Sequence, residues 1–118
     1  MRKLTLVLIA VIFSATAAFA QIEIQSGKFT ANQSSQGWSL DKNSGDRSFL
    51  LVVPFPKPFQ TTPKVVLSIN MIDADGAFNM RYDVQAIAVS RDNITIKIAT
   101  WADSKIYGIG GSWIAHTE

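Results

Sequence analysis

The sequence predicts an all-β fold, a six-stranded antiparallel β-sandwich formed by residues 21–118. Three observations support this fold class. Apolar and polar residues alternate with a period of two in several segments, which is typical of strands with one buried face. Short polar turns rich in Asp, Asn, Ser and Gly separate these segments. After the first 20 residues, no segment has a sustained helical period.

The N-terminal segment, residues 1–20, has the organisation of a secretory signal peptide. Two basic residues follow the first methionine, residues 4–13 are apolar, and residues 18–20 form a small-residue cleavage site. The apolar run is only about half of the ~20 residues that a membrane-spanning helix needs. We therefore expect cleavage after Ala20, secretion of a single domain over residues 21–118, and no membrane insertion of the mature chain. An uncleaved anchor helix is the alternative.

Composition excludes several classes of protein. The chain carries 11 Lys and Arg against 9 Asp and Glu, and two of the basic residues fall in the expected leader. The mature domain therefore has no net charge and no basic tract, so we expect no nucleic-acid partner bound through phosphates. Cysteine is absent, which removes disulfides, thiol chemistry and cysteine-bound zinc. Stability must come from the core and from oligomerisation.

The first two expected strands flank a long polar loop. Residues 21–29 alternate weakly and contain Gly27, which predicts a bulge or bend in the first strand. Residues 31–45 are rich in Ser, Asn, Gln and Gly and predict a surface loop. Its Trp38 is interpreted as an anchor that plugs one end of the core, with a ligand contact as the alternative. Residues 47–55 are the most apolar stretch of the mature chain and predict a central strand.

Turn signals delimit the four remaining strands. Alternating prolines over residues 54–59 remove backbone donors and end the second strand. Turns are expected at residues 73–76 and 90–93, where short polar runs interrupt the alternation. The strands that these signals separate cover residues 64–71, 80–89, 93–101 and 105–115.

Trp101 occupies an unusual place at the end of the fifth expected strand. Three isoleucines of that strand share the face expected to point into the core, whereas Trp101 lies on the opposite face together with Lys97. A large aromatic side chain at a strand end beside a turn is poorly placed to be core. Tyr107 follows six residues later and could face the same opening. This end of the sandwich is therefore the candidate binding region.

Catalytic and metal-binding constellations are not predicted. The single histidine, His116, lies two residues from the C terminus and is interpreted as a surface position, so Ser-His-Asp and Cys-His arrangements are not expected. Glycoside hydrolysis would depend on aspartates alone. Asp73 and Asp75 belong to the sequence DADG, interpreted as a turn, with an incomplete calcium loop as the alternative. We expect no enzyme, no metal and no cofactor.

Three passages together resemble the H-type lectin domain, the small β-sandwich of snail agglutinins and of the C-terminal part of discoidins. The passages are residues 55–67 (FPKPFQTTPKVVL), 79–81 (NMR), and 100–107 (TWADSKIY) with 112–114 (SWI). Residues 25–27 (QSG) also resemble the family's opening. The matches span nearly the whole mature chain in the right order.

This resemblance implies binding of galactose- or N-acetylgalactosamine-type sugars, without a metal, in clefts between the protomers of a homotrimer. It assigns Arg81 to the sugar-contacting arginine of the family's Asn-x-Arg motif. Trp101 and Tyr107 match the aromatic residues of the cleft, and their alternative role is packing between protomers. The alternative for Arg81 is an exposed salt bridge with Asp83, which would contribute roughly 0–1 kcal/mol.

At two further places in the site this sequence departs from the family's pattern. Gly45 and Asp46 are nearest to the family's glycine-aspartate pair before the second strand, although the loop length differs by one residue, and Asp41 is the alternative. Ala102 stands where snail members that prefer N-acetylgalactosamine carry a histidine beside the tryptophan. The resemblance therefore implies no preference between the two sugars.

The residue types suit a sugar site. A carboxylate and a guanidinium together can hold adjacent pyranose hydroxyls through charge-assisted hydrogen bonds, and an aromatic ring can lie against the apolar face of galactose. We expect a secreted, calcium-independent lectin for glycans with terminal galactose or N-acetylgalactosamine, acting in cell adhesion, whose weak sites gain avidity in a trimer. The alternative is a secreted protein-interaction module without sugar binding. Asn32 and Asn93 begin glycosylation sequons, which matter only in a eukaryotic host.

Overall fold

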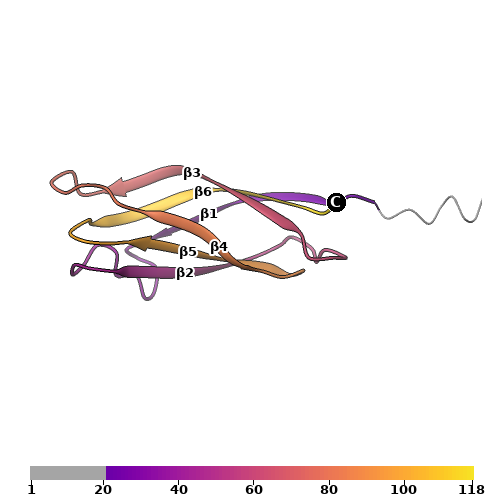
Figure 1. The fold of residues 1–118 in the computed structure, drawn as a ribbon, viewed down its shortest axis with the longest axis horizontal. Coiled ribbons are helices and arrows are strands. Elements are labelled where there is room, and N and C mark those ends of the chain that lie inside the picture. Colours follow the sequence, from indigo (N-terminus) through magenta and orange to yellow (C-terminus); the bar gives the residue numbers. More distant parts are fainter. Residues whose placement is uncertain (1–20) are drawn as a thin grey trace, which may run out of the picture.

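The computed structural model describes residues 21–118, which form two packed three-stranded antiparallel sheets (Figure 1). The expected signal peptide lies outside the described residues. One sheet has the strand order β1-β6-β3 and the other β2-β5-β4. The strands are β1 (Ile24–Asn32), β2 (Arg47–Pro54), β3 (Lys64–Ala74), β4 (Asp83–Val89), β5 (Asn93–Thr100) and β6 (Ile106–His116). The predicted six-stranded antiparallel sandwich is confirmed, but β2, predicted as a central strand, is an edge strand of its sheet. The trimer stays a prediction. No helix within residues 21–118 is long and apolar enough to cross a membrane.

The core lies between the two sheets and is built from alternate residues of the strands. The three isoleucines of β5 that alternate along the chain, Ile94, Ile96 and Ile98, are fully buried, as predicted. Burial of each such side chain stabilises the fold by about 1.5–3 kcal/mol. Phe55 packs at 5.4 Å from the ring of Trp113 in β6 and closes the end of the sandwich near the C terminus. The other end is left to the loops that form the candidate site.

Trp38 anchors the long loop between β1 and β2. Its side chain is buried, its ring packs against Phe49 at 5.3 Å, and its indole nitrogen donates a hydrogen bond of 3.0 Å to the carbonyl of Ile106. The loop therefore lies against the start of β6 instead of extending into solvent. The interpretation of Trp38 as a loop anchor is confirmed.

The bulge predicted at Gly27 is wrong. β1 pairs with β6 in an unbroken register from Ile24 to Asn32. The strand therefore begins and ends three residues later than the strand expected at residues 21–29. Gly27 lies opposite Trp113, and a Cβ atom at this position would lie only 2.7 Å from Cζ2 of the indole ring. The glycine makes room for a core side chain of the neighbouring strand. Its role is packing, not a change of strand direction.

The connection between β3 and β4 also differs from the expectation. β3 continues to Ala74, so that Asp73 lies in the ladder opposite Gly108. The turn follows at Asp75, whose carbonyl accepts a hydrogen bond of 3.4 Å from the amide of Phe78. The turn predicted at residues 73–76 is present, but it is shifted by two residues because pairing with β6 extends the strand.

The fourth strand is shorter than predicted and its alternation breaks. It begins at Asp83 and not at residue 80, and its register with β5 shifts between Ala86 and Ala88. After this bulge Val89 packs against the core, whereas Ala88 is exposed. A bulge adds one residue to one strand and so exchanges the two faces. Residues 80–82 become part of the connection that leads to the candidate site.

Candidate functional site

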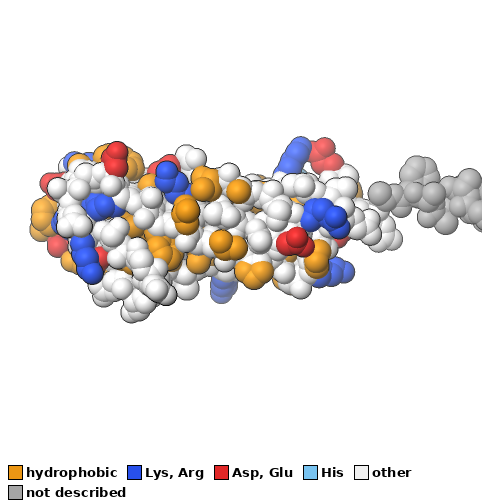
Figure 2. Space-filling model, turned by 90° about the horizontal axis from the view of Figure 1, so that it is seen from below, with side chains coloured by type: hydrophobic (Ala, Val, Ile, Leu, Met, Phe, Trp, Pro, Cys, Tyr) orange, Lys and Arg blue, Asp and Glu red, His pale blue; other side chains and the backbone are white. Residues whose placement is uncertain are grey.

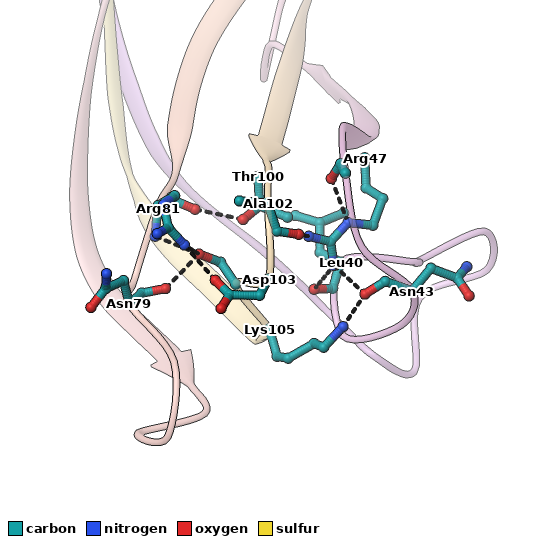
Figure 3. A network of polar contacts seen from close by, with 11 residues as sticks. Leu40, Asn43, Arg47, Asn79, Arg81, Thr100, Ala102, Asp103 and Lys105 are labelled. Carbon is teal, nitrogen blue, oxygen red and sulfur yellow. Dashed lines mark hydrogen bonds and ion pairs between the residues drawn. The ribbon is translucent and has the colours of Figure 1, made fainter.

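Three connections meet at the end of the sandwich far from the C terminus, on the left in Figure 1. They are the loop of residues 33–46, the β3–β4 connection of residues 75–82, and the β5–β6 turn of residues 101–105. Every residue that the resemblance assigned to sugar binding lies in or beside these connections. Figure 3 shows the polar contacts that join them.

A pocket of about 250 Å³ opens on the outer face of the β2-β5-β4 sheet beside the β5–β6 turn. It brings together Asp46 and Trp101, two of the predicted site residues. The side chain of Trp101 is 41% exposed, so the indole ring is available to a ligand. The remaining lining residues are Arg47, Ser48, Lys97, Ala99 and Thr100. The predicted placement of Trp101 away from the core is confirmed.

The small residues of the pocket floor follow from strand pairing. Ser48 of β2 lies opposite Ala99 of β5, and both residues belong to the face away from the core. Because neither side chain is large, the surface between Trp101 and Lys97 is hollow. Alternation in β5 thus produces both a filled core face and an open outer face.

Arg47, which the sequence did not single out, holds the pocket together. Its guanidinium is buried, with 9% exposure for the residue, and it donates to backbone carbonyls. The acceptors are Gly45 at 2.9 Å, Leu40 at 3.3 Å, Lys42 at 2.9 Å, Asn43 at 3.4 Å and Ala102 at 3.0 Å. This one side chain fastens the loop before β2 to the β5–β6 turn. The only sign of this role in the sequence is the position of Arg47, which begins the most apolar strand directly after a glycine-containing loop.

Gly45 and Ala102 form the backbone support of the pocket. The amide of Gly45 donates to the carbonyl of Ala102 at 2.9 Å. Both residues have left-handed backbones, with φ of 83° at Gly45 and 57° at Ala102. Alanine in this conformation costs about 1–2 kcal/mol, because Cβ crowds the following carbonyl oxygen. The strained turn directs the Ala102 carbonyl toward Arg47 and leaves Trp101 at the pocket rim.

Arg81 lies on the opposite side of the same turn. Its Nη1 atom donates to Oδ1 of Asp103 at 2.6 Å and to the hydroxyl of Ser104 at 3.2 Å. The alternative pairing with Asp83 is wrong, because the Asp83 carboxylate accepts instead from Gln85 at 2.8 Å. The side chain of Arg81 is 28% exposed. Within residues 21–118 its Nε and Nη2 atoms have no hydrogen-bond partner, so they remain available as donors.

Two hydroxyls fix the backbone around Arg81. Ser104 is fully buried; its Oγ accepts from the Arg81 amide at 3.1 Å and donates to the carbonyl of Asn79. Thr100 donates to the carbonyl of Arg81 at 2.6 Å. Because β5 lies between β2 and β4 in its sheet, Arg81 and Asp46 flank the end of β5 on opposite sides. Arg81 does not line the pocket that contains Asp46 and Trp101.

Tyr107 occupies a third place, at the start of β6 in the other sheet. Its hydroxyl donates to Oδ2 of Asp75 at 3.2 Å. This hydrogen bond, followed by partial desolvation and the negative charges of Asp75, Asp41 and Asp73, raises the pKa of Tyr107 above its ordinary value. Tyr107 and Asp41 do not line the pocket either. Of the two candidate aspartates, the structure brings Asp46 to Trp101.

The DADG segment ends β3 with Asp73 and Ala74 and begins the turn with Asp75 and Gly76. Oδ1 of Asp75 accepts from the amide of Ala77 at 2.9 Å, a local bond that is typical of an aspartate in a turn. Within residues 21–118, no three His, Asp or Glu side chains are grouped so that they could hold a metal ion.

The family of the chain follows from a direct comparison. Residues 51–116 match the model of the H-type lectin domain, which is more than half of the chain. This chain belongs to the H-type lectin domain family. The predicted membership is confirmed, and it supports a carbohydrate-binding domain.

Two relatives and one solved fold extend this result. The domain is 30% identical over 91 residues to the protein named ATP synthase subunits region ORF 7 of Fuscovulum blasticum, covering 77% of this chain and 79% of that protein. It is 32% identical over 78 residues to a discoidin-1 chain of Dictyostelium discoideum, covering 65% of this chain but 31% of that protein. Discoidin II of the same organism has the same fold, with a TM-score of 0.72 and 20% identity over 84% of this chain and 38% of the discoidin II chain. This chain thus spans about a third of the length of each discoidin.

Proposed function

We propose that this H-type lectin domain is a secreted, calcium-independent lectin for glycans that end in galactose or N-acetylgalactosamine. The observation that carries the proposal is the pocket in which Asp46 and the exposed indole of Trp101 lie together. A carboxylate accepts hydrogen bonds from two neighbouring hydroxyls, and an indole ring supplies a flat apolar surface for the C–H face of a sugar. Both contacts suit a terminal galactose-type unit.

We place Arg81 in this site through assembly. In one chain Arg81 lies across the β5–β6 turn from the pocket, with two guanidinium nitrogens unused among the described residues. A site formed between two copies would combine Asp46 and Trp101 of one protomer with Arg81 of the next protomer. Tyr107 would then contribute to the rim or to the contact between protomers.

The surface composition supports such an assembly. Leu50, Val52 and Ile87 are 50–58% exposed on the outer face of the β2-β5-β4 sheet. Figure 2 shows hydrophobic side chains along the middle of one side of the molecule, with charged side chains toward both ends. Burial of an apolar sheet face is a common driving force for obligate oligomers. Three sites on one rigid trimer would raise avidity by about 10²–10⁴ over a single weak site.

A glycan array in the presence of EDTA tests this proposal. The protein is expected to bind glycans with terminal galactose or N-acetylgalactosamine, and free galactose is expected to inhibit the binding. Trp101→Ala and Arg81→Ala are each expected to reduce the affinity at least tenfold, since each removes a central contact. Ile114→Ala, which removes an equally exposed apolar side chain from the other sheet, is the matched control and should bind normally. Full binding by Arg81→Ala would reject the site assignment.

Mixing of two variants tests whether the site lies between protomers. Trp101→Ala and Arg81→Ala proteins are unfolded together and refolded. If one protomer supplies Trp101 and the next supplies Arg81, the mixed oligomers contain some intact sites and regain part of the binding. If both residues act within one chain, every site in the mixture carries a defect and no binding returns.

A protein-interaction module is the second candidate. The β3–β4 connection exposes Phe78, Met80 and Tyr82, each by 39–53%, and such a cluster is typical of a protein contact surface. A glycan array without any bound sugar would favour this function over the lectin.

A further inference from the structure

The pocket extends beyond the two residues that define the proposed sugar site. Lys97 and Ala99 follow one another on the outer face of β5, and Trp101 comes directly after the strand, so Lys97 lines the end of the pocket that is opposite Trp101. At a rise of about 3.3 Å per residue, roughly 13 Å separates the backbone positions of Trp101 and Lys97. Between them the floor is formed by Ala99 and Ser48. The space is longer than a single stacked sugar ring requires.

The charge of Lys97 is not neutralised by the described part of the chain. The ion pairs found within residues 21–118 are Lys64–Glu118 and Arg81–Asp103, and the Lys97 side chain makes no hydrogen bond to another described residue. Its cross-strand neighbours are Leu50 and Gln85, neither of which is charged. The nearest acidic residue in the register, Asp83, lies opposite Ala99 and accepts from Gln85. Lys97 therefore presents a free ammonium group to the pocket.

The usual reason for an exposed strand lysine does not apply to this position. Lysines commonly protect the edge strands of a sheet against pairing with other chains, but β5 is the central strand of β2-β5-β4. Lys97 also interrupts an outer face that otherwise exposes Leu50, Val52 and Ile87. A cation in the middle of a sheet, at the end of a ligand pocket, points to recognition of an anion.

We propose that Lys97, assisted by the hydroxyl of Ser48, forms a second subsite that takes an anionic substituent of the bound glycan, a sulfate ester or a carboxylate. The proposal rests on the proposed lectin function, because Asp46 and Trp101 hold the neutral sugar unit to which this anion belongs. At the Trp101 end the pocket carries Asp46 beside Arg47, whose nitrogens already donate to backbone carbonyls. Lys97, at the other end, has an ammonium group without such acceptors, so it draws the anionic substituent away from Trp101 and orients the glycan.

Titration calorimetry with three ligands tests the subsite. The ligands are lactose, lactose sulfated on its galactose, and lactobionate, which keeps the terminal galactose and carries a carboxylate, each at low ionic strength. The protein is expected to bind at least one anionic ligand about fivefold more tightly than lactose, which is the upper range for an exposed ion pair. The gain should shrink in high salt, because salt screens exposed charges. Comparison of the sulfated ligand with lactobionate shows which anion the subsite accepts.

Substitutions at Lys97 identify the group responsible. Lys97→Gln is expected to abolish the gain while its affinity for lactose stays unchanged, and Lys97→Arg is expected to retain the gain. Lys28→Gln removes the same charge from the outer face of the other sheet and is the matched control. Equal affinity of the wild-type protein for neutral and anionic ligands, or an undiminished gain in Lys97→Gln, would overturn the subsite alone. Absence of any lactose binding by the wild-type protein would instead overturn the proposed function, and the subsite with it.

Discussion

Two arginines flank the β5–β6 turn and use the same type of side chain for different roles. Arg47 is buried and directs its hydrogen bonds to backbone carbonyls of the 40–45 loop and of Ala102. Arg81 is partly exposed, and its Nη1 atom donates hydrogen bonds to Asp103 and Ser104. Figure 3 shows the two guanidinium groups on either side of the turn.

The difference separates an arginine that builds a site from one that can serve it. A guanidinium carries five N–H donors and no acceptor. When carbonyls occupy its three nitrogens, as at Arg47, the side chain fixes a loop and has little left for a ligand. When two nitrogens stay unused within the described chain, as at Arg81, the side chain can form a bidentate contact with sugar hydroxyls. The number of guanidinium nitrogens already bonded within the protein therefore distinguishes these two roles.

Replacement of Arg47 gives the largest expected effect. Arg47→Ala removes the side-chain bonds that fasten the 40–45 loop to the turn, and should lower the free energy of unfolding by about 3 kcal/mol, because hydrogen bonds to a charged donor are strong but the freed loop carbonyls regain water. Urea unfolding measures the change. Arg47→Lys, which keeps the charge but not the fork, is expected to fall between Arg47→Ala and wild type. An unchanged unfolding midpoint in Arg47→Ala would show that Arg47 does not stabilise the loop and the turn.

Replacement of Arg81 should separate stability from binding. Its ion pair joins a partly exposed guanidinium to an Asp103 side chain that is 60% exposed, and such pairs contribute about 1 kcal/mol or less. Arg81→Ala is therefore expected to shift the urea midpoint much less than Arg47→Ala, while its sugar affinity falls at least tenfold. A loss of stability as large as that of Arg47→Ala would mean that Arg81 is also a structural residue.

Local patterns in the sequence predicted most of the fold and the placement of Trp101. Alternation along β5 is a property of consecutive residues, so it correctly assigned the isoleucines to the core and Trp101 to the outer face. The Gly27 prediction failed because the indole that crowds this glycine comes from Trp113, a residue far along the chain. The bulge in β4 was missed for a similar reason, since its register is set by pairing with β5.

The supporting parts of the site depend on contacts that a sequence pattern does not contain. The acceptors of Arg47 are backbone carbonyls, which every residue has, so no residue type marks them. The partner of Arg81 is Asp103, 22 residues away. The sequence had suggested a salt bridge with the neighbouring Asp83 instead. The family resemblance assigned Asp46, Arg81 and Tyr107 to a sugar-binding cleft. The three separate positions that they occupy became visible only in the structure.

The turn between the two arginines offers the smallest and most specific test. Ala102 has a left-handed backbone with φ of 57°, and its carbonyl accepts from both Arg47 and Gly45. Glycine adopts this conformation without the Cβ clash but loses more entropy on folding, so Ala102→Gly is expected to raise the free energy of unfolding by about 0.5 kcal/mol.

A matched glycine substitution makes this small effect interpretable. Ala99→Gly changes the same residue type in the extended backbone of β5, where glycine should instead lower the free energy of unfolding by about 0.5–1 kcal/mol. Urea unfolding of both variants compares the two signs directly. If Ala102→Gly destabilises the protein as much as Ala99→Gly, the turn is not strained. The Ala102 carbonyl would then be held toward Arg47 at no conformational cost, and the fixed position of the turn would depend on its hydrogen bonds with Arg47 and Gly45.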